Sequence, residues 1–169
     1  MAFEVSYGPQ DFTPTRGLVQ GATQKVFATS STNRHAFAFD DSTQEGVTSK
    51  PFIAPDTTTA SGVLKCELKI SAASDTTNTA AFQVGLECIT DADSLNLTTA
   101  DSFDTTSTGS VTLSGTAGDQ HKIEVTIANT DGLTAGDQVR LSIARDTPTA
   151  DTASGDLYLY AARLYQEAT

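Results

Sequence analysis

Two stretches in the C-terminal third of the chain alternate apolar and polar residues. In residues 138–144 every second side chain is valine, leucine or isoleucine, and in residues 156–165 leucines alternate with tyrosines. A period of two places alternate side chains on opposite faces of a β-strand. The segment between them is rich in Asp, Thr, Pro and Gly, which favour turns. These features predict two strands joined by a polar loop and an all-β sandwich as the fold class.

The same alternation recurs upstream and predicts six further strands, at residues 36–39, 50–54, 63–72, 81–90, 110–114 and 122–128. A set of about eight strands suits a jelly roll or an immunoglobulin-like sandwich, and the lack of tryptophan disfavours the latter. We therefore predict a jelly-roll β-sandwich over residues 33–169. Its core should contain the apolar-phase residues Leu64, Cys66, Leu68, Ile70, Phe82, Val84, Leu86, Ile123, Val125, Ile127, Val139, Leu141 and Ile143.

Residues 1–32 show no sustained periodicity and are interrupted by glycine and proline. We expect this segment to be an extended N-terminal arm that either covers the sandwich or reaches a neighbouring subunit. The expected contacts of the arm are its dispersed apolar residues Phe3, Val5, Tyr7, Phe12, Leu18 and Val19.

The charge balance and the cysteines limit the partners. The formal net charge of −11 repels phosphate groups, so nucleic acid is not expected as a ligand. The sequence has no secretory signal and no apolar run near the ~18 residues of a membrane span, which predicts synthesis in a cytoplasm and no membrane partner. Cys66 and Cys88 fall on the apolar phase of predicted strands, which favours buried thiols over a disulfide.

Metal-binding and cofactor motifs are weak. His35 and His121 have no second ligand at metal-binding spacing, and nucleotide-binding motifs are absent. Residues 91–96 resemble a calcium loop but lack the glycine and glutamate that such a loop needs. The aspartates Asp146, Asp151 and Asp156 could converge on a cation, although turn capping explains them better. No cofactor is expected.

Side chains suited to catalysis or sugar binding give a limited signal. Glu45 follows two aspartates in what the sequence predicts to be a solvated turn. Tyr158 and Tyr160 share one strand face, with Tyr165 on the other phase, which permits a small sugar-binding platform. Nothing selects a pair of carboxylates with the separation that a glycoside hydrolase requires. We expect a protein that is not an enzyme.

Four segments resemble small jelly-roll proteins of tailed bacteriophage particles: residues 36–41 with Glu45, residues 51–55, residues 135–146 and residues 151–160. The similarity spans about residues 33–165, and it departs from the family near Phe82, where the related strand often carries tryptophan. The motifs are structural, so the resemblance implies no catalytic residue. Related domains occur as head decoration (cement) proteins and within tail fibres or spikes.

The resemblance implies a structural virion protein, with a capsid cement protein as the first expectation. Such a protein would be assembled in the host cytoplasm and would lie on the capsid surface as a homotrimer. It would bind the major capsid protein across capsomer seams and stabilise the head. The alternatives are a tail-associated receptor-binding domain and a carbohydrate-binding module, with a hydrolase as a distant further option. If the arm makes these contacts, deletion of residues 2–20 should leave a soluble β-domain that no longer binds capsids or no longer trimerises.

Overall fold

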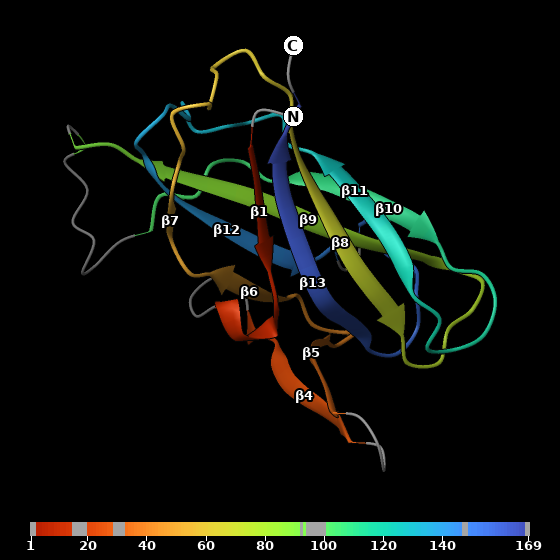
Figure 1. The fold of residues 1–169 in the computed structure, drawn as a ribbon. Helices are drawn as coiled ribbons and strands as arrows, with labels where there is room; N and C mark the ends of the chain where they lie inside the picture. The colour runs from red at the N-terminus through yellow and green to blue at the C-terminus, as the bar shows by residue number, and fades with distance from the viewer. Residues whose placement is uncertain are drawn as a thin grey trace.

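The structure is a computed structural model that describes residues 3–14, 20–28, 33–91, 93, 101–146 and 149–167. Two β-sheets pack face to face, and in Figure 1 β1, β13 and β8 cross over β9 and β12. Sheet A has the strand order β11 (His121–Thr126), β8 (Leu64–Ala72), β13 (Leu157–Gln166), β5 (Asn33–Phe39) and β4 (Thr23–Ala28), and β1 (Phe3–Tyr7) also pairs with β13. The predicted jelly-roll β-sandwich is confirmed.

Sheet B has the order β10 (Ser107–Thr112), β9 (Thr79–Ile89), β12 (Gln138–Arg145), β6 (Glu45–Ser49) and β2 (Phe12–Pro14). Two short strands extend it, since β3 (Gln20–Gly21) joins β6 and β7 (Phe52–Ile53) joins β12. The pairing of β3 with β6 is parallel and the other pairings are antiparallel. One 3₁₀ turn, η1 (Pro9–Asp11), connects β1 to β2.

The predicted core is confirmed. Each apolar-phase residue named from the sequence is buried between the two sheets: Leu64, Cys66, Leu68, Ile70, Phe82, Val84, Leu86, Ile123, Val125, Ile127, Val139, Leu141 and Ile143. Both cysteines are free, buried thiols, as their phase predicted. Burial raises the pKa of the Cys66 thiol to about 12, so this group stays protonated at neutral pH.

The strand predicted at residues 50–54 departs most from the structure. The sequence predicted a strand at 50–54, but the structure has β6 at Glu45–Ser49 and only a two-residue strand, β7, after it. Val47 is the one large apolar residue of β6, so the strand has little alternation to detect. Its position is fixed by tertiary partners instead, because Ser49 accepts a hydrogen bond from Leu141 N and β6 pairs with both β12 and β2.

The described part of residues 1–32 lies against the sandwich, the first of the two alternatives, but it forms paired strands and not an extended arm. β1 pairs with β13 from Phe3 opposite Gln166 to Tyr7 opposite Ala162, and β2 pairs with β6. The rings of Phe3, Tyr7 and Phe12 are 7%, 5% and 6% exposed and belong to the core. Val5 is partly buried against the same core, whereas residues 18 and 19 lie outside the described residues.

The arm prediction failed for a physical reason. β1 and β2 are short and are paired with strands far away in sequence, so their own patterns carry little information. The rings of Phe3, Tyr7 and Phe12, which were predicted to contact a capsid protein or another subunit, instead pack against residues of this chain. Residue 32 is therefore not a boundary between an arm and a sandwich.

The buried Arg145 side chain joins segments on which the expected resemblance to phage virion proteins rests. Its Nε donates to Asp151 at 2.6 Å, and its Nη1 donates to the carbonyl oxygens of Phe39 and Gly155 at 3.1 and 2.7 Å. Its Nη2 donates to Ala153 O. These bonds connect three of the four segments.

The remaining segment is attached through the backbone. Ala54 N donates to Asp137 O at 2.8 Å, and Gly136 N donates to Ala54 O at 2.9 Å. The four segments on which that expectation rests therefore tie loops of the sandwich together.

The three loop aspartates do not converge on a cation site. Asp146 accepts a hydrogen bond from Gln83, Asp151 pairs with Arg145, and Asp156 lies 3.8 Å from Lys25 Nζ. Within the described ranges, no group of three or more His, Cys, Asp or Glu side chains is placed to hold a metal ion. The calcium-like run at 91–96 lies mostly outside those ranges. The part of the chain that the structure describes also has no helix long and apolar enough to span a bilayer.

Candidate functional site

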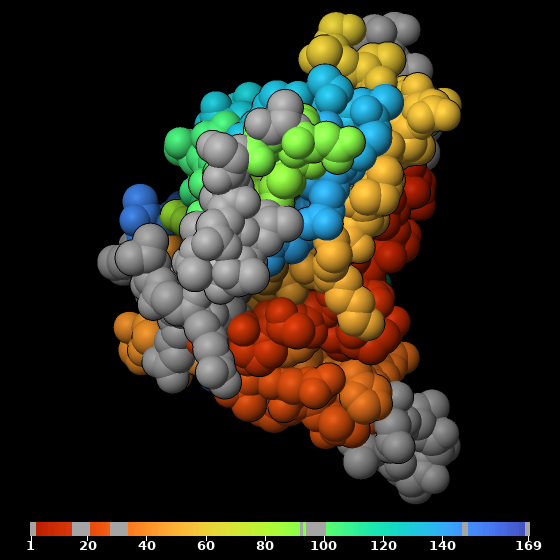
Figure 2. Space-filling model, turned by 90° about the vertical axis from the view of Figure 1, so that its left-hand side faces the viewer, coloured from red at the N-terminus to blue at the C-terminus, as the bar shows by residue number. Residues whose placement is uncertain are grey.

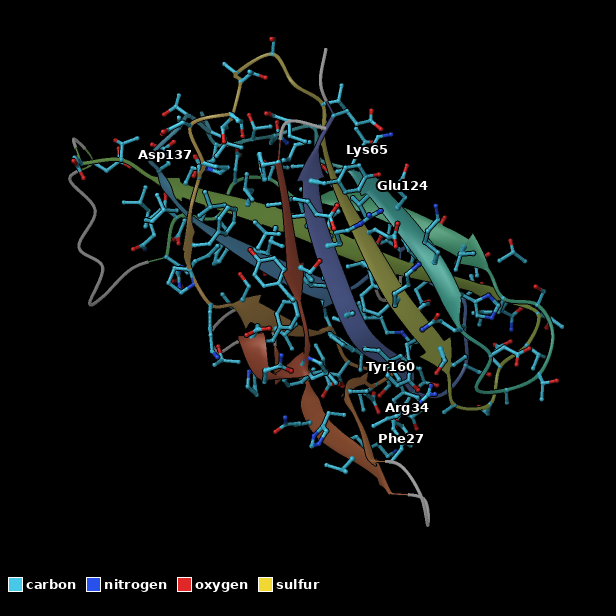
Figure 3. The ribbon with its side chains drawn as sticks, viewed as in Figure 1. Phe27, Arg34, Lys65, Glu124, Asp137 and Tyr160 are labelled. Atoms are coloured by element: carbon cyan, nitrogen blue, oxygen red, sulfur yellow. The ribbon has the colours of Figure 1, made fainter. Side chains whose placement is uncertain are left out.

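The outer face of sheet A carries a cluster of aromatic rings that is separate from the core. Phe27 of β4 and Tyr160 of β13 are partly buried and pack against Tyr158, Ala36 and Ala38. We call these five residues the aromatic surface. Figure 3 labels Phe27 and Tyr160, which lie where the β4–β5 hairpin extends from the body of the sandwich. The two alanines of β5 leave room for the larger rings beside them.

The rings hold one another in place. The Phe27 and Tyr158 rings meet edge to face with centroids 4.8 Å apart, and the Phe27 and Tyr160 centroids are 6.2 Å apart. Lys25 Nζ donates to Tyr158 Oη at 2.9 Å and lies 4.9 Å from the centre of that ring. Ser71 Oγ and Tyr160 Oη are hydrogen-bonded at 3.0 Å. The aromatic surface is therefore ordered before any ligand arrives.

A β-bulge at Tyr160 changes which tyrosines share a face. In the pairing of β13 with β8, Leu159 is opposite Ile70 and Ala161 is opposite Lys69, so Tyr160 is the extra residue. A bulge of one residue reverses the inside–outside alternation that follows it. Tyr165 was predicted on the opposite phase, but its hydroxyl donates to Glu124 on the outer face of sheet A. Tyr158, Tyr160 and Tyr165 thus lie on one face.

A pocket of about 290 Å³ adjoins the aromatic surface. It is lined by Thr23, Lys25, Ala38, Asp40, Glu45 and Asp156. Of these, Ala38 belongs to the aromatic surface and Lys25 is hydrogen-bonded to its Tyr158. The pocket brings three carboxylates and one ammonium group beside the rings. Such groups can accept and donate hydrogen bonds to the hydroxyls of a ligand.

Glu45, which lines this pocket, is only 7% exposed as a residue, so the predicted solvated turn is wrong for it. Its Oε2 accepts a hydrogen bond from Asp40 N at 2.7 Å. Burial, helped by the negative charges of Asp40 and Asp156, raises the pKa of Glu45. Hydrogen bonds from Ser42, by contrast, lower the pKa of Asp40. The two neighbouring carboxyls therefore differ in how readily they ionise.

Replacing Glu45 with glutamine should stabilise the fold near pH 8 and change little near pH 4. The pKa of Glu45 is higher in the folded than in the unfolded state, so its ionisation destabilises the fold as pH rises through that window. The amide oxygen of Glu45→Gln can still accept the hydrogen bond from Asp40 N. Urea unfolding of both proteins at the two pH values measures the effect.

Glu124→Gln is the matched control for this prediction. The hydrogen bond from Tyr165 lowers the pKa of Glu124, so the ionised Glu124 carboxylate stabilises the fold. Replacing this carboxylate with an amide should therefore reduce stability at the higher pH. Equal effects of Glu45→Gln at both pH values would show that burial of the charge is not the cause.

A larger cavity, of about 370 Å³, lies on the other sheet. It is lined by Thr13, Pro14, Thr48, Ser49, Lys50, Pro51, Asp101 and Arg140. Figure 2 shows this side of the molecule, where the N-terminal segment (red) lies against the segment around residues 45–55 (orange). Arg140 is held there by the buried Glu87 and by Asp101. This cavity has no aromatic ring among its described lining residues, so it suits a ligand with apolar faces less well.

Comparison with known proteins bears on the fold alone. No protein-family model matches the chain, and no curated protein sequence matches it. Solved structures do match, among them a cleaved adhesin domain of Lys-gingipain from Porphyromonas gingivalis, with 11% identity and a TM-score of 0.56 over 98% of this chain and 99% of that one.

Two further similar structures contain carbohydrate-binding modules. The first comprises the CBM22-1 and GH10 modules of endo-1,4-β-D-xylanase 10B from Clostridium thermocellum, complexed with xylohexaose, at 13% identity and a TM-score of 0.55. The match covers 99% of this chain but 29% of that one, so the chain spans less than a third of the xylanase fragment. The second is the C-terminal CBM6 of LamC from Zobellia galactanivorans, at 12% identity and a TM-score of 0.50, over 96% and 98% of the two chains. At these identities the comparison establishes a shared β-sandwich fold.

Proposed function

We propose that this protein is a carbohydrate-binding β-sandwich domain without catalytic activity, and that its ligand packs on the aromatic surface. The observation that carries the proposal is the gathering of Phe27, Tyr158 and Tyr160 on one outer sheet face, beside the pocket with Asp40 and Glu45. Sugar rings have apolar faces that pack on aromatic rings, and hydroxyl groups that bond to carboxylates and ammonium groups. The aromatic surface and the pocket offer both kinds of contact side by side.

The fold is compatible with the same function. The xylanase fragment complexed with xylohexaose and the CBM6 of LamC share a sandwich of this kind, although their identity to this chain is too low to transfer a ligand. The local charge indicates the class of glycan. Three carboxylates surround one lysine in the pocket, and the whole chain carries a net charge of −11. Polysaccharides rich in uronic acid or sulfate would be repelled, so we infer an uncharged glycan.

The test is affinity gel electrophoresis against a panel of uncharged and acidic polysaccharides. We expect an uncharged polysaccharide to retard the protein, and Tyr160→Ala or Phe27→Ala to weaken that binding at least about tenfold, or about 1.4 kcal/mol. Ile53→Ala is the matched control, because Ile53 is 63% exposed on β7, in the other sheet. Equal retardation of the aromatic variants and the control, with unchanged melting temperatures, would contradict a site on the aromatic surface.

A virion structural protein, most simply a capsid cement protein, remains a second proposed function. It is favoured by the four segments that resemble phage virion proteins, which here tie the sandwich together around Arg145 and Ala54. A homotrimer bound to the major capsid protein belongs to the same proposal. Because Phe3, Tyr7 and Phe12 are buried, the contact with a capsid would need other residues. Copy number in purified particles is the test: hundreds of copies would indicate the head, and a few dozen or fewer the tail.

A further inference from the structure

Strand β13 changes its neighbour on one side, and this change leaves a notch in the outer face of sheet A. Leu157–Leu159 pair with β5, whereas the segment from Ala162 to Gln166 pairs with β1. Between these two pairings lies a cavity of about 230 Å³, which we call the notch. It is lined by Ser6, Tyr7, Glu67, Lys69, Ala161, Ala162 and Arg163. Ala161 and Ala162 lie where β13 changes its partner strand, and their small side chains leave the notch open.

The notch carries charged groups suited to bind hydroxyls. Glu67 accepts hydrogen bonds from Arg163 Nη2 at 2.8 Å, and Lys69 Nζ lies 2.7 Å from its other oxygen. The hydrogen bond from Lys69 lowers the pKa of Glu67, so the carboxylate is ionised at neutral pH. Arg163 Nε is buried and has no hydrogen-bond partner among the described residues. Buried donors are usually satisfied, which points to a water or a ligand oxygen beside it.

The aromatic surface, the notch and Tyr165 follow one another along the outer face of β13. From Tyr158 to Tyr165 the strand covers at most about 23 Å at roughly 3.3 Å per residue. At the far end, the Arg163 guanidinium lies 4.8 Å from the Tyr165 ring centre, and Lys65 pairs with Glu124 at 3.4 Å. The whole row is therefore longer than a single sugar ring needs.

The charges along this row are balanced. Each of the cations Lys65, Lys69 and Arg163 lies within 4 Å of a carboxylate. Paired charges offer donors and acceptors without a net attraction for an ion. This favours an uncharged ligand with many hydroxyl groups.

We propose that the protein binds an internal stretch of a linear, uncharged polysaccharide, laid along β13 from the aromatic surface through the notch to Tyr165. This inference rests on the proposed carbohydrate-binding function and extends it to the length of the ligand. The row lies on the outer face of a sheet, so a chain can enter and leave it at both ends. Sugars packed on the aromatic surface would supply the apolar contact, and those in the notch would bond to Glu67 and Arg163.

The test compares a disaccharide and a hexasaccharide prepared from the polysaccharide that retards the protein in the affinity gel. Titration calorimetry should show that the hexasaccharide binds at least about tenfold more tightly than the disaccharide. Ala161→Met fills the notch and should lower the affinity for the hexasaccharide about tenfold while leaving disaccharide binding unchanged. Thr108→Met, on an exposed position of β10 in the other sheet, is the matched control.

A second variant keeps the test valid if Ala161→Met fails to fold. Arg163→Gln removes the guanidinium from the notch without adding volume, and should reduce the affinity for the hexasaccharide but not for the disaccharide. If the disaccharide binds as tightly as the hexasaccharide, or if both folded notch variants bind the hexasaccharide normally, the extended site is overturned while the aromatic surface stands. If the unaltered protein binds no polysaccharide in the gel, the proposed carbohydrate-binding function is contradicted, and with it the proposed extended site.

Discussion

Deletion of residues 2–20 is expected to prevent folding. The deletion removes the rings of Phe3, Tyr7 and Phe12 from the core and the pairing of β1 with β13. The Tyr7 and Phe12 ring centres are 5.6 Å apart, and Phe12 meets Phe37 edge to face at 6.4 Å, so these rings are part of a continuous cluster. Truncation of one buried aromatic ring costs about 3–5 kcal/mol. Three such losses reach the total stability of an ordinary domain, about 5–15 kcal/mol.

Far-ultraviolet circular dichroism and thermal melting of the truncated protein measure this effect. Glu4→Ala is the control, because this side chain lies on the outer face of β1 and its ion pair with Arg163, at 3.5 Å, lies at the surface. It should change stability by less than about 1 kcal/mol. A truncated protein that melts cooperatively near the temperature of the full chain would show that the N-terminal strands are an appendage after all.

The second large effect is expected at Arg145. Its side chain is 0% exposed and binds Asp151 and three carbonyl oxygens. Arg145→Met should destabilise the protein by about 3–5 kcal/mol, because the Asp151 carboxylate would be left buried without its partner. The loop from Asp151 to Gly155 would also lose its attachment to β5.

A double variant separates the two causes. In Arg145→Met with Asp151→Asn, the buried charge is gone while the amide oxygen can still accept from Ala81 N, which bonds to Asp151 at 3.1 Å. The double variant should therefore be more stable than Arg145→Met alone in urea unfolding. Lys122→Met, at a largely exposed lysine of β11, is the control and should be nearly neutral. A cost below about 1 kcal/mol for Arg145→Met would refute the structural role of the ion pair.

The strands that the sequence predicted best are those with long, uninterrupted alternation. Residues 64–72 and 138–144 have apolar side chains at every second position, and these positions are buried between the sheets. The sequence did not predict β1, β2 and β6 because these strands are short and pair with strands distant in the sequence. Phe3 and Gln166 are paired although they stand near opposite ends of the sequence. Local periodicity contains no information about such a contact.

The candidate site was visible only in part. Tyr158 and Tyr160 stood out as neighbours on one strand face, but Phe27 joins them through β5, a tertiary arrangement that its own surroundings do not indicate. Tyr165 was assigned to the other phase because the alternation was extended through Tyr160, where the bulge interrupts it. Glu45 was predicted to be solvated because it stands in a polar turn. Its burial depends on segments distant in the sequence, which the local sequence does not indicate. Each failure concerns a feature created by pairing or packing across the chain.

Backbone-amide chemical shifts during titration with the hexasaccharide test the central claim most directly. The account predicts that the largest changes fall on the outer face of sheet A, at β4, β5 and β13 around Phe27, Ala38 and Tyr160. Tyr160→Ala should remove these changes while the spectrum of the core remains that of the folded protein. Changes concentrated instead on sheet B around Arg140, or no saturable changes with any uncharged polysaccharide, would contradict a glycan site on the aromatic surface.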